Sequence, residues 1–160
     1  MIFVTLGTQD KPFVRLLKAL DKALVKGSIK DRVVVQAGTT KYESTNMEIF
    51  DFLDIKAFED CIKECDLLIT HGGVGSIFTG LKKGKKVIAV SRLSKYGEHV
   101  NDHQLEIVRK FVDDGYILEL RDFNKISKIL DKASKMRFKK MKNVSNKRMV
   151  NLIEDFIDKI

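Results

Sequence analysis

The sequence lacks the features that would place it in several well-marked classes of protein. Its 160 residues include no tryptophan, one proline and two cysteines, and no apolar run reaches the roughly 18 residues of a membrane-spanning helix. Cys61 and Cys65 lie four residues apart on one expected helix, so we interpret them as reduced packing residues rather than a disulfide framework or a metal site. Met1 leads directly into an apolar strand without the basic leader of a signal peptide. These absences favour a cytoplasmic protein.

Positive charge is unevenly distributed along the chain. The net charge is +8, and the segment from Arg121 to Arg148 holds eleven lysines and arginines against two aspartates, which makes +9 there and leaves −1 for the remainder. Such a segment can bind nucleic acid, an anionic membrane surface or an acidic partner, or it can be a solvated helix face. Its only aromatic residues are Phe123 and Phe138. We therefore expect no base-stacking platform and no specific binding of nucleic acid.

Short β-branched apolar runs alternate with segments of helical period, which is typical of strands and helices that alternate around a parallel sheet. We expect strands over Ile2–Leu6, Arg32–Gln36, Asp66–Thr70, Val87–Val90 and Tyr116–Leu120, and Met47–Leu53 is ambiguous, with a short strand as one reading. We expect helices from about Asp10 to Gly27, Ala57 to Glu64, Ser76 to Lys83 and Asn101 to Asp114. In the first of these, Asp10 would be the cap and Pro12 would stand in the first turn.

The predicted fold class is therefore α/β, a Rossmann-like parallel sheet flanked by helices. Residues 1–122 carry the alternating pattern and form the expected domain, and 44% of the whole chain is hydrophobic, enough for a substantial core. Residues 123–160 are expected to form one or two basic and amphipathic helices that pack on the domain, on a partner, or on both. Their apolar stripe consists of Met149, Leu152, Ile153, Phe156 and Ile157.

The most distinctive segment follows the expected strand at Asp66–Thr70 and reads Leu68-Ile-Thr-His-Gly-Gly-Val-Gly-Ser-Ile-Phe78. Glycines allow close approach of the backbone to a ligand, and the helix that follows offers unpaired N–H groups and the positive end of its dipole. We interpret the segment as a phosphate-binding turn for a nucleotide diphosphate; a tight strand-to-helix connection is the alternative. The sequence has neither the dinucleotide fingerprint after the first strand nor a Walker lysine-serine pair, which disfavours NAD dehydrogenases and P-loop kinases.

Polar loops follow several of the expected strands. In an open parallel sheet, ligands bind beyond the carboxyl ends of the strands. Four loops are predicted to converge at that edge: Gly7-Thr8-Gln9, Gly38-Thr39-Thr40, His71 to Ser76, and Arg92 to Gln104.

Two motifs together carry a resemblance to a known family. With His71-Gly-Gly-Val-Gly-Ser76 and Arg92-Leu-Ser-Lys-Tyr-Gly-Glu-His-Val-Asn-Asp-His-Gln-Leu-Glu106, the chain resembles the glycosyltransferase family 28 C-terminal domain, the nucleotide-sugar half of GT-B glycosyltransferases. The likeness runs from Phe3 to about Leu120. More particularly, the chain looks like the stand-alone small subunits of this family: that of the dolichol-linked second-GlcNAc transferase and those of bacterial capsular or exopolysaccharide galactosyltransferases. The bacterial branch fits better, because the chain is lysine-rich and stops soon after the domain.

The resemblance implies roles for individual residues. Ser76 and the N–H groups around Gly73 to Gly75 would hold the donor diphosphate, His71 would contact the same phosphates, and His103 with Gln104 would reach the hydroxyls of the donor sugar. The implied catalytic residues are His71 and Glu98. The implied UDP-sugar-binding residues are Gly7, Thr8, His71, Gly72, Gly73, Val74, Gly75, Ser76, Arg92, Asn101, His103 and Gln104.

The resemblance implies neither a metal nor another cofactor. His99 and His103 do stand four residues apart, a spacing that zinc ligands use, but no third ligand clusters with them.

The function implied by the resemblance is that of an inverting UDP-hexosyltransferase subunit, with galactose favoured over GlcNAc as the donor sugar. Its acceptor would be lipid-linked, in capsular or exopolysaccharide biosynthesis. The chain is too short to hold an acceptor-binding half, so a membrane-anchored partner would supply that half and the catalytic base, and would keep the protein at the inner face of the membrane. Residues from about Asn143 to Ile160 would contact the partner or fold back on the domain, and the lysines between Lys125 and Lys142 would lie near anionic lipids. The alternative is a non-enzymatic nucleotide-binding regulatory module.

Overall fold

A parallel sheet forms the centre of the computed structural model, which describes residues 1–141, 151 and 154. Within these residues the sheet has six strands in the order β3-β2-β1-β4-β5-β6, and every neighbouring pair is parallel. This order is that of a doubly wound Rossmann sheet, whose strand order reverses between β1 and β4. The strands are β1 (Ile2–Thr5), β2 (Val33–Gln36), β3 (Glu48–Phe50), β4 (Leu67–His71), β5 (Lys86–Val90) and β6 (Leu118–Glu119).

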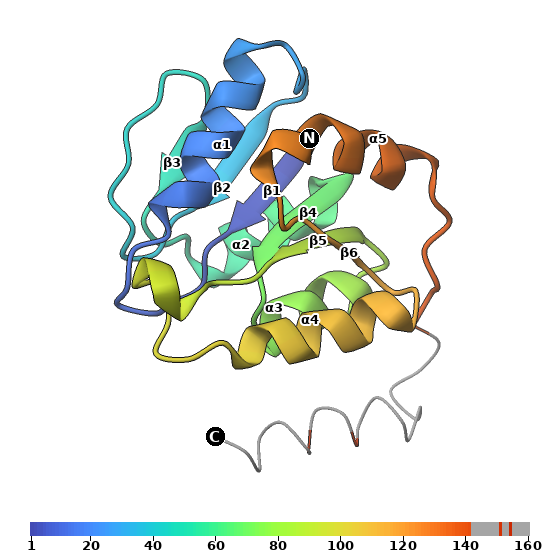
Figure 1. The fold of residues 1–160 in the computed structure, drawn as a ribbon. Helices are drawn as coiled ribbons and strands as arrows, with labels where there is room; N and C mark the ends of the chain where they lie inside the picture. Colours follow the sequence, from blue (N-terminus) through green and yellow to red (C-terminus); the bar gives the residue numbers. More distant parts are fainter. Residues whose placement is uncertain (142–150, 152–153, 155–160) are drawn as a thin grey trace.

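Helices cover both faces of the sheet (Figure 1). Helices α1 (Val14–Val25) and α5 (Ile126–Lys135) lie on one face. On the other face lie α2 (Ile55–Glu64), α3 (Val74–Lys82) and α4 (His103–Asp113). Two short 3₁₀ helices, η1 (Ser94–Tyr96) and η2 (Phe123–Lys125), lie in the connections after β5 and β6. The predicted α/β fold class is confirmed.

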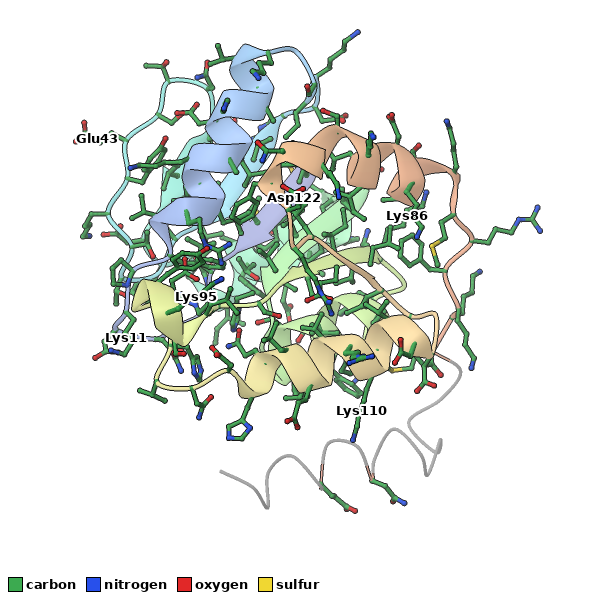
Figure 2. All side chains as sticks on the ribbon, in the orientation of Figure 1. Lys11, Glu43, Lys86, Lys95, Lys110 and Asp122 are labelled. Atoms are coloured by element: carbon green, nitrogen blue, oxygen red, sulfur yellow. The ribbon has the colours of Figure 1, made fainter. Side chains whose placement is uncertain are left out.

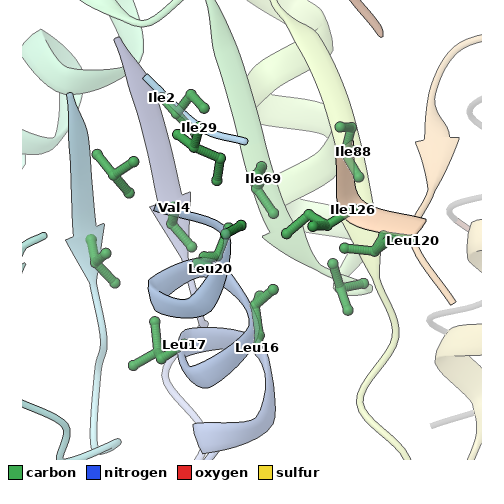
Figure 3. Close-up of a cluster of buried hydrophobic side chains, with 14 of the residues drawn as sticks. Ile2, Val4, Leu16, Leu17, Leu20, Ile29, Ile69, Ile88, Leu120 and Ile126 are labelled. Carbon is green, nitrogen blue, oxygen red and sulfur yellow. The ribbon is translucent and has the colours of Figure 1, made fainter. Parts of the chain in front are cut away.

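Each face of the sheet carries its own apolar core, because successive side chains of a strand point to opposite faces. Ile2 and Val4 of β1 pack with Leu16 and Leu20 of α1, as Figure 3 shows. Phe3, between them, packs on the opposite side with α2, where its ring meets Phe58 edge-on at 5.4 Å between centroids. Strands β1, β2, β4 and β5 are buried on both faces, which explains why they read as continuous apolar runs.

The beginning of α1 differs from the prediction. The helix starts at Val14 rather than near Asp10, and its cap position is Phe13, so the assignment of Asp10 as the cap is wrong. Pro12 disfavours helical backbone at the preceding residue. Phe13 is fully buried, and its N–H donates to Thr40 Oγ1 at 3.0 Å. Residues 9–13 therefore form part of the loop at the carboxyl edge of the sheet instead of the first helical turn.

Other boundaries differ by a few residues. Helix α3 begins at Val74, two residues before the predicted Ser76. Helix α4 begins two residues later than predicted, because Asn101 Oδ1 accepts a hydrogen bond from the N–H of His103 at 3.2 Å and forms a turn before the helix. The ambiguous segment Met47–Leu53 contains the short edge strand β3.

The segment after residue 122 begins with η2 and α5, and α5 buries Ile126 and Ala133 against the core beside α1. Of the predicted partner-binding segment, residues 143–160, all but Asn151 and Glu154 lie outside the described residues. No helix in the described part of the chain is both long and apolar enough to cross a membrane.

Candidate functional site

The loops after β1, β2 and β4 meet so closely that only glycine fits at their contacts. Gly7 has a φ of +79°, and a Cβ atom there would lie 2.6 Å from His71 Nε2. A Cβ atom on Gly73 would overlap the same ring nitrogen, and one on Gly38, whose φ is +62°, would overlap the carbonyl oxygen of Gly7. The predicted convergence of these loops at the carboxyl edge is therefore present, with the His71 ring at its centre.

His71 ends β4 and is half-buried. Its Nδ1 lies 3.4 Å from Thr70 Oγ1, and that hydroxyl pairs with Thr5 Oγ1 at 2.8 Å across the β1–β4 boundary. Burial, with the positive charge of Arg92 acting in the same direction, lowers the pKa of His71 to about 4. The imidazole is therefore neutral at pH 7 in the free protein.

The N-terminus of α3 is open. Its cap residue, Gly73, offers no side-chain hydrogen bond, and the first helical bond runs from the N–H of Ile77 to the Gly73 carbonyl. The N–H groups of Val74, Gly75 and Ser76 consequently have no carbonyl of their own helix to bond. A Cβ atom on Gly75 would meet no heavy atom within 4 Å. This combination of free N–H groups, a helix dipole and open space is suited to binding an anion.

Arg92 was expected to touch the donor, and the structure places its guanidinium in the protein interior, where the side chain is 1% exposed. Nη1 donates to the carbonyl oxygens of Lys11 (2.6 Å) and Glu98 (3.2 Å), and Nη2 donates to that of Leu6. Arg92 thus ties the loop after β1 to the loop after β5. Figure 2 shows Lys11 and Lys95, one from each loop, at the same end of the molecule.

Gln104 links the loop after β5 to the glycine loop. Its Oε1 accepts the N–H of Arg92 at 3.0 Å, and a Cβ atom on Gly72 would lie 2.9 Å from Gln104 Cβ. The side chain is buried. Gln104 therefore lies against the glycine loop, and its side-chain carbonyl oxygen is already engaged by the backbone of Arg92.

Glu98, one of the two residues assigned a catalytic role, is held in an ion pair. Its carboxylate is buried and accepts from Arg15 Nε at 2.8 Å, from Arg15 Nη2 at 2.9 Å and from the N–H of Leu93 at 3.0 Å. This geometry supports a role in fixing the loop after β5. Arg15, which the sequence analysis did not single out, lies 83 residues away in sequence, and no local pattern marks the pair.

The remaining histidines lie at the rim of the site. His99 Nε2 lies 3.0 Å from Gln9 Nε2, and His99 Nδ1 accepts the N–H of Asn101 at 3.2 Å. His103 and Thr8 are exposed. Within the described residues, no three His, Cys, Asp or Glu side chains cluster as metal ligands would.

Phe52, which the sequence analysis did not single out, places an exposed aromatic ring at the same edge. Phe52 is 56% exposed and follows β3, and its ring lies 3.9 Å from the position that a Cβ atom on Gly38 would take. The N–H of Leu53 donates to Gln36 Oε1 at 3.0 Å, which anchors this loop to β2. The ring offers an apolar face beside the glycines. In the sequence Phe52 stands in the ambiguous segment Met47–Leu53. The strand in that segment is so short that its carboxyl end, and with it the position of Phe52, could not be predicted.

Comparison with protein-family models identifies one family. The whole chain, residues 1–160, matches the model of the glycosyltransferase family 28 C-terminal domain. The chain is similar to the human UDP-N-acetylglucosamine transferase subunit ALG13, with 31% identity over 124 residues, 72% of this chain and 10% of the human protein. The subunit of the same name from Debaryomyces hansenii is 35% identical over 101 residues, 62% of this chain and 44% of that protein. The chain thus spans less than half the length of either curated relative.

Solved structures show the same architecture. The NMR solution structure of ALG13 superposes with a TM-score of 0.62 at 22% identity, covering 94% of this chain and 93% of that one. The crystal structure of the kitacinnamycin glycotransferase gives a TM-score of 0.57 at 15% identity, covering 99% of this chain and 40% of that one. At these identities the likeness establishes the fold: a Rossmann-like sheet of the kind that forms the C-terminal half of GT-B glycosyltransferases.

Proposed function

Because the chain belongs to the glycosyltransferase family 28 C-terminal domain family, we propose that it is the donor-binding half of a UDP-sugar glycosyltransferase. The observation that carries the proposal is the open N-terminus of α3, where the N–H groups of Val74, Gly75 and Ser76 lie beside a glycine-lined edge. A diphosphate bound there accepts these hydrogen bonds and gains from the helix dipole.

The proposed chemistry is stabilisation of the departing UDP. As the bond from the sugar to the diphosphate breaks, negative charge grows on the phosphate oxygens, and donors fixed in place beforehand stabilise it. His71 contributes an N–H hydrogen bond rather than a charge, since its pKa is about 4. The same low pKa makes it a weak proton acceptor at pH 7. Removal of the proton from the acceptor hydroxyl is therefore assigned to a partner.

The relatives' names guide the choice of sugar and partner. Both are called UDP-N-acetylglucosamine transferase subunits, so we propose N-acetylglucosamine as the donor sugar in place of galactose. These relatives are eukaryotic and lend no support to a bacterial capsular or exopolysaccharide role. The word subunit in their names is consistent with a separate acceptor-binding chain. A membrane-anchored partner, a lipid-linked acceptor, inversion at the sugar and a cytoplasmic location at the membrane surface complete the proposal.

The exposed ring of Phe52 suggests where the base lies. Aromatic side chains stack on nucleobases, and a stacked base contributes about 1–3 kcal/mol to binding. Phe52 stands at the edge that also holds Gly38 and Gly7. We place the pyrimidine of UDP against this ring and the diphosphate at α3.

The test is calorimetric titration of the full chain with UDP, UDP-N-acetylglucosamine and UDP-galactose, with ADP and NAD as controls. The proposal expects binding selective for uridine nucleotides and weakened about tenfold by Ser76→Ala, the loss of one hydrogen bond to a charged group. Ser134→Ala is the matched control, because Ser134 is exposed and its Oγ donates to the Asp131 carbonyl oxygen within α5. Binding that both variants share with the wild type places the nucleotide elsewhere.

A non-enzymatic nucleotide-binding regulatory module predicts the same binding results. The two functions differ in whether sugar moves. Only the enzyme transfers N-acetylglucosamine to a lipid-linked acceptor when the chain is combined with its partner, and only the enzyme loses that transfer when Ser76 is replaced by alanine. Nucleotide binding without transfer in the assembled complex supports the regulatory module.

A further inference from the structure

A cavity opens at the carboxyl edge of the sheet, beside β6 and away from the glycine loop. Its volume is about 520 Å³, within the range of small-molecule sites. The loop after β5 contributes Ser91, Leu93, Lys95 and Asp102, and α4 contributes Leu105, Glu106 and Arg109. The far wall comes from Glu119, Leu120 and Arg121 at the end of β6.

The loop after β5 is the wall between this cavity and the glycine edge. Arg92 and Gln104 are turned toward the loops after β1 and β4, where Gln104 touches Gly72. Their neighbours Ser91, Leu93 and Leu105 line the cavity instead. A ligand in the cavity would thus touch the loop after β5 on the side that faces away from the glycine loop.

Two buried polar atoms in the cavity wall lack hydrogen-bond partners. Ser91 is 6% exposed and the Glu119 side chain 7% exposed, yet neither Ser91 Oγ nor Glu119 Oε1 has a partner in the described structure. The other carboxylate oxygen of Glu119 pairs with Arg121 Nε at 2.6 Å. Buried polar groups in folded proteins are almost always hydrogen-bonded, because a buried group without a hydrogen bond lowers the stability of the fold. Two such groups in one cavity point to a ligand that supplies the missing bonds.

The chemistry of the wall narrows the ligand class. A carboxylate oxygen accepts hydrogen bonds only, so the group facing Glu119 must be a donor such as a hydroxyl. Lys95, Arg109 and Arg121 bring positive charge to the cavity and outnumber the two further carboxylates of its lining, Asp102 and Glu106. Three leucines supply apolar surface for the carbon face of a ring. Arginine pairs especially well with phosphate. A sugar phosphate carries both hydroxyl donors and a phosphate, so it matches this wall.

We propose that this cavity binds a sugar phosphate, with its hydroxyls on Glu119 and Ser91 and its phosphate toward Arg109 and Arg121. The ligand has two possible sources: a free sugar phosphate, or the glycosyl diphosphate end of a lipid-linked acceptor. The second source rests on the proposed transferase function, and the first does not. Binding in the cavity is independent of whether UDP binds at α3, so the two proposals fail separately.

The test is a titration of the ¹⁵N-labelled full chain with N-acetylglucosamine 1-phosphate, followed by amide chemical shifts. The expected shifts fall on residues 91–95, 102–106 and 119–121. Ser91→Ala removes one hydrogen bond to the ligand, and Glu119→Gln removes the charge that strengthens another, so each should weaken binding about tenfold. Ser91→Ala removes no hydrogen bond that the described structure contains, so its fold is expected to be retained. Ser76→Ala, at the other site, should leave this affinity unchanged.

Two further titrations separate the sources and control for charge. An alkyl diphosphate ester of N-acetylglucosamine that binds as tightly as the free sugar phosphate indicates the acceptor end, and rejection of the ester indicates the free metabolite. Inorganic phosphate alone should bind at least tenfold more weakly. Shifts confined to residues 72–76 and lost in Ser76→Ala, or no shifts at millimolar ligand, would overturn the proposal.

Discussion

The guanidinium of Arg15 donates hydrogen bonds to both carboxylate oxygens of Glu98, at 2.8 and 2.9 Å, and so joins α1 to the loop after β5. The guanidinium also lies 4.6 Å from the ring centroids of both Tyr96 and Phe123. Phe123 opens the segment that leads into α5, and Tyr96 belongs to η1. One side chain therefore joins the loop after β5, helix α1 and the start of the C-terminal segment.

Replacing Glu98 by glutamine should lower the free energy of unfolding by about 2 kcal/mol, because it leaves the partly buried Arg15 without its counter-charge. Urea denaturation of the two proteins measures the difference. Glu106→Gln is the matched control, since Glu106 is an exposed carboxylate, and it should change stability by less than about 0.5 kcal/mol. Equal effects of the two substitutions would show that the buried pair contributes nothing of its own.

His71 should make stability depend on pH. Its folded pKa of about 4 lies below the unfolded value of 6.5, so between these values the unfolded chain binds more protons and stability falls as pH decreases. From pH 7.5 to pH 5, His71 should account for roughly 2 kcal/mol of lost stability.

The measurement is urea denaturation at both pH values for the wild type, His71→Gln and His103→Gln. The His71 substitution should remove that part of the pH dependence, and substitution of the exposed His103 should leave it in place. A wild-type pH dependence retained in full by His71→Gln would contradict the assignment.

Gly7→Ala should be more harmful than the same change at Gly27. Both glycines have positive φ, +79° and +70°, so alanine is strained at either position by about 1 kcal/mol. A Cβ atom on Gly27 meets nothing within 4 Å, whereas one on Gly7 meets the His71 ring at 2.6 Å. The additional loss of stability in Gly7→Ala, expected to be 1–3 kcal/mol, reports the overpacking against His71. Thermal or urea unfolding of the two variants provides the comparison. Equal losses of stability would mean that the His71 ring moves away from the new methyl group at little cost in free energy.

Gly75→Ala should separate stability from binding. The position is helical and open, so alanine should raise stability by about 0.5–1 kcal/mol through reduced backbone entropy of the unfolded chain. The new methyl group would occupy the space assigned to the diphosphate, so affinity for UDP should fall at least tenfold. Unfolding and calorimetric titration of one variant test both halves. A more stable protein that binds UDP as well as the wild type would place the phosphates away from Gly75.

The sequence was most informative where the signal is local. Strand and helix types, the sheet's carboxyl edge and the glycine loop all follow from apolar periodicity and from the chain order of turns. The pairing of Arg15 with Glu98 could not be predicted in this way, because it depends on how two elements 83 residues apart pack together. Aspartate is a favoured residue type at helix caps, which led to the assignment of Asp10. In the structure Phe13 is buried and takes the cap position instead. Arg92 illustrates a related ambiguity. The sequence of a loop does not indicate whether a basic side chain in it points to a bound phosphate or into the protein interior.

The central claim, that the diphosphate of UDP binds at the N-terminus of α3 beside His71, is tested most directly by titrating His71 itself. The ¹H–¹³C NMR signal of its ring, followed against pH with and without saturating UDP, gives the pKa in both states. The free protein should show a pKa of about 4, and UDP should raise it by at least about one unit, since a nearby anion favours the charged imidazole. UDP that binds without moving the pKa of His71, or that does not bind at all, would contradict the account.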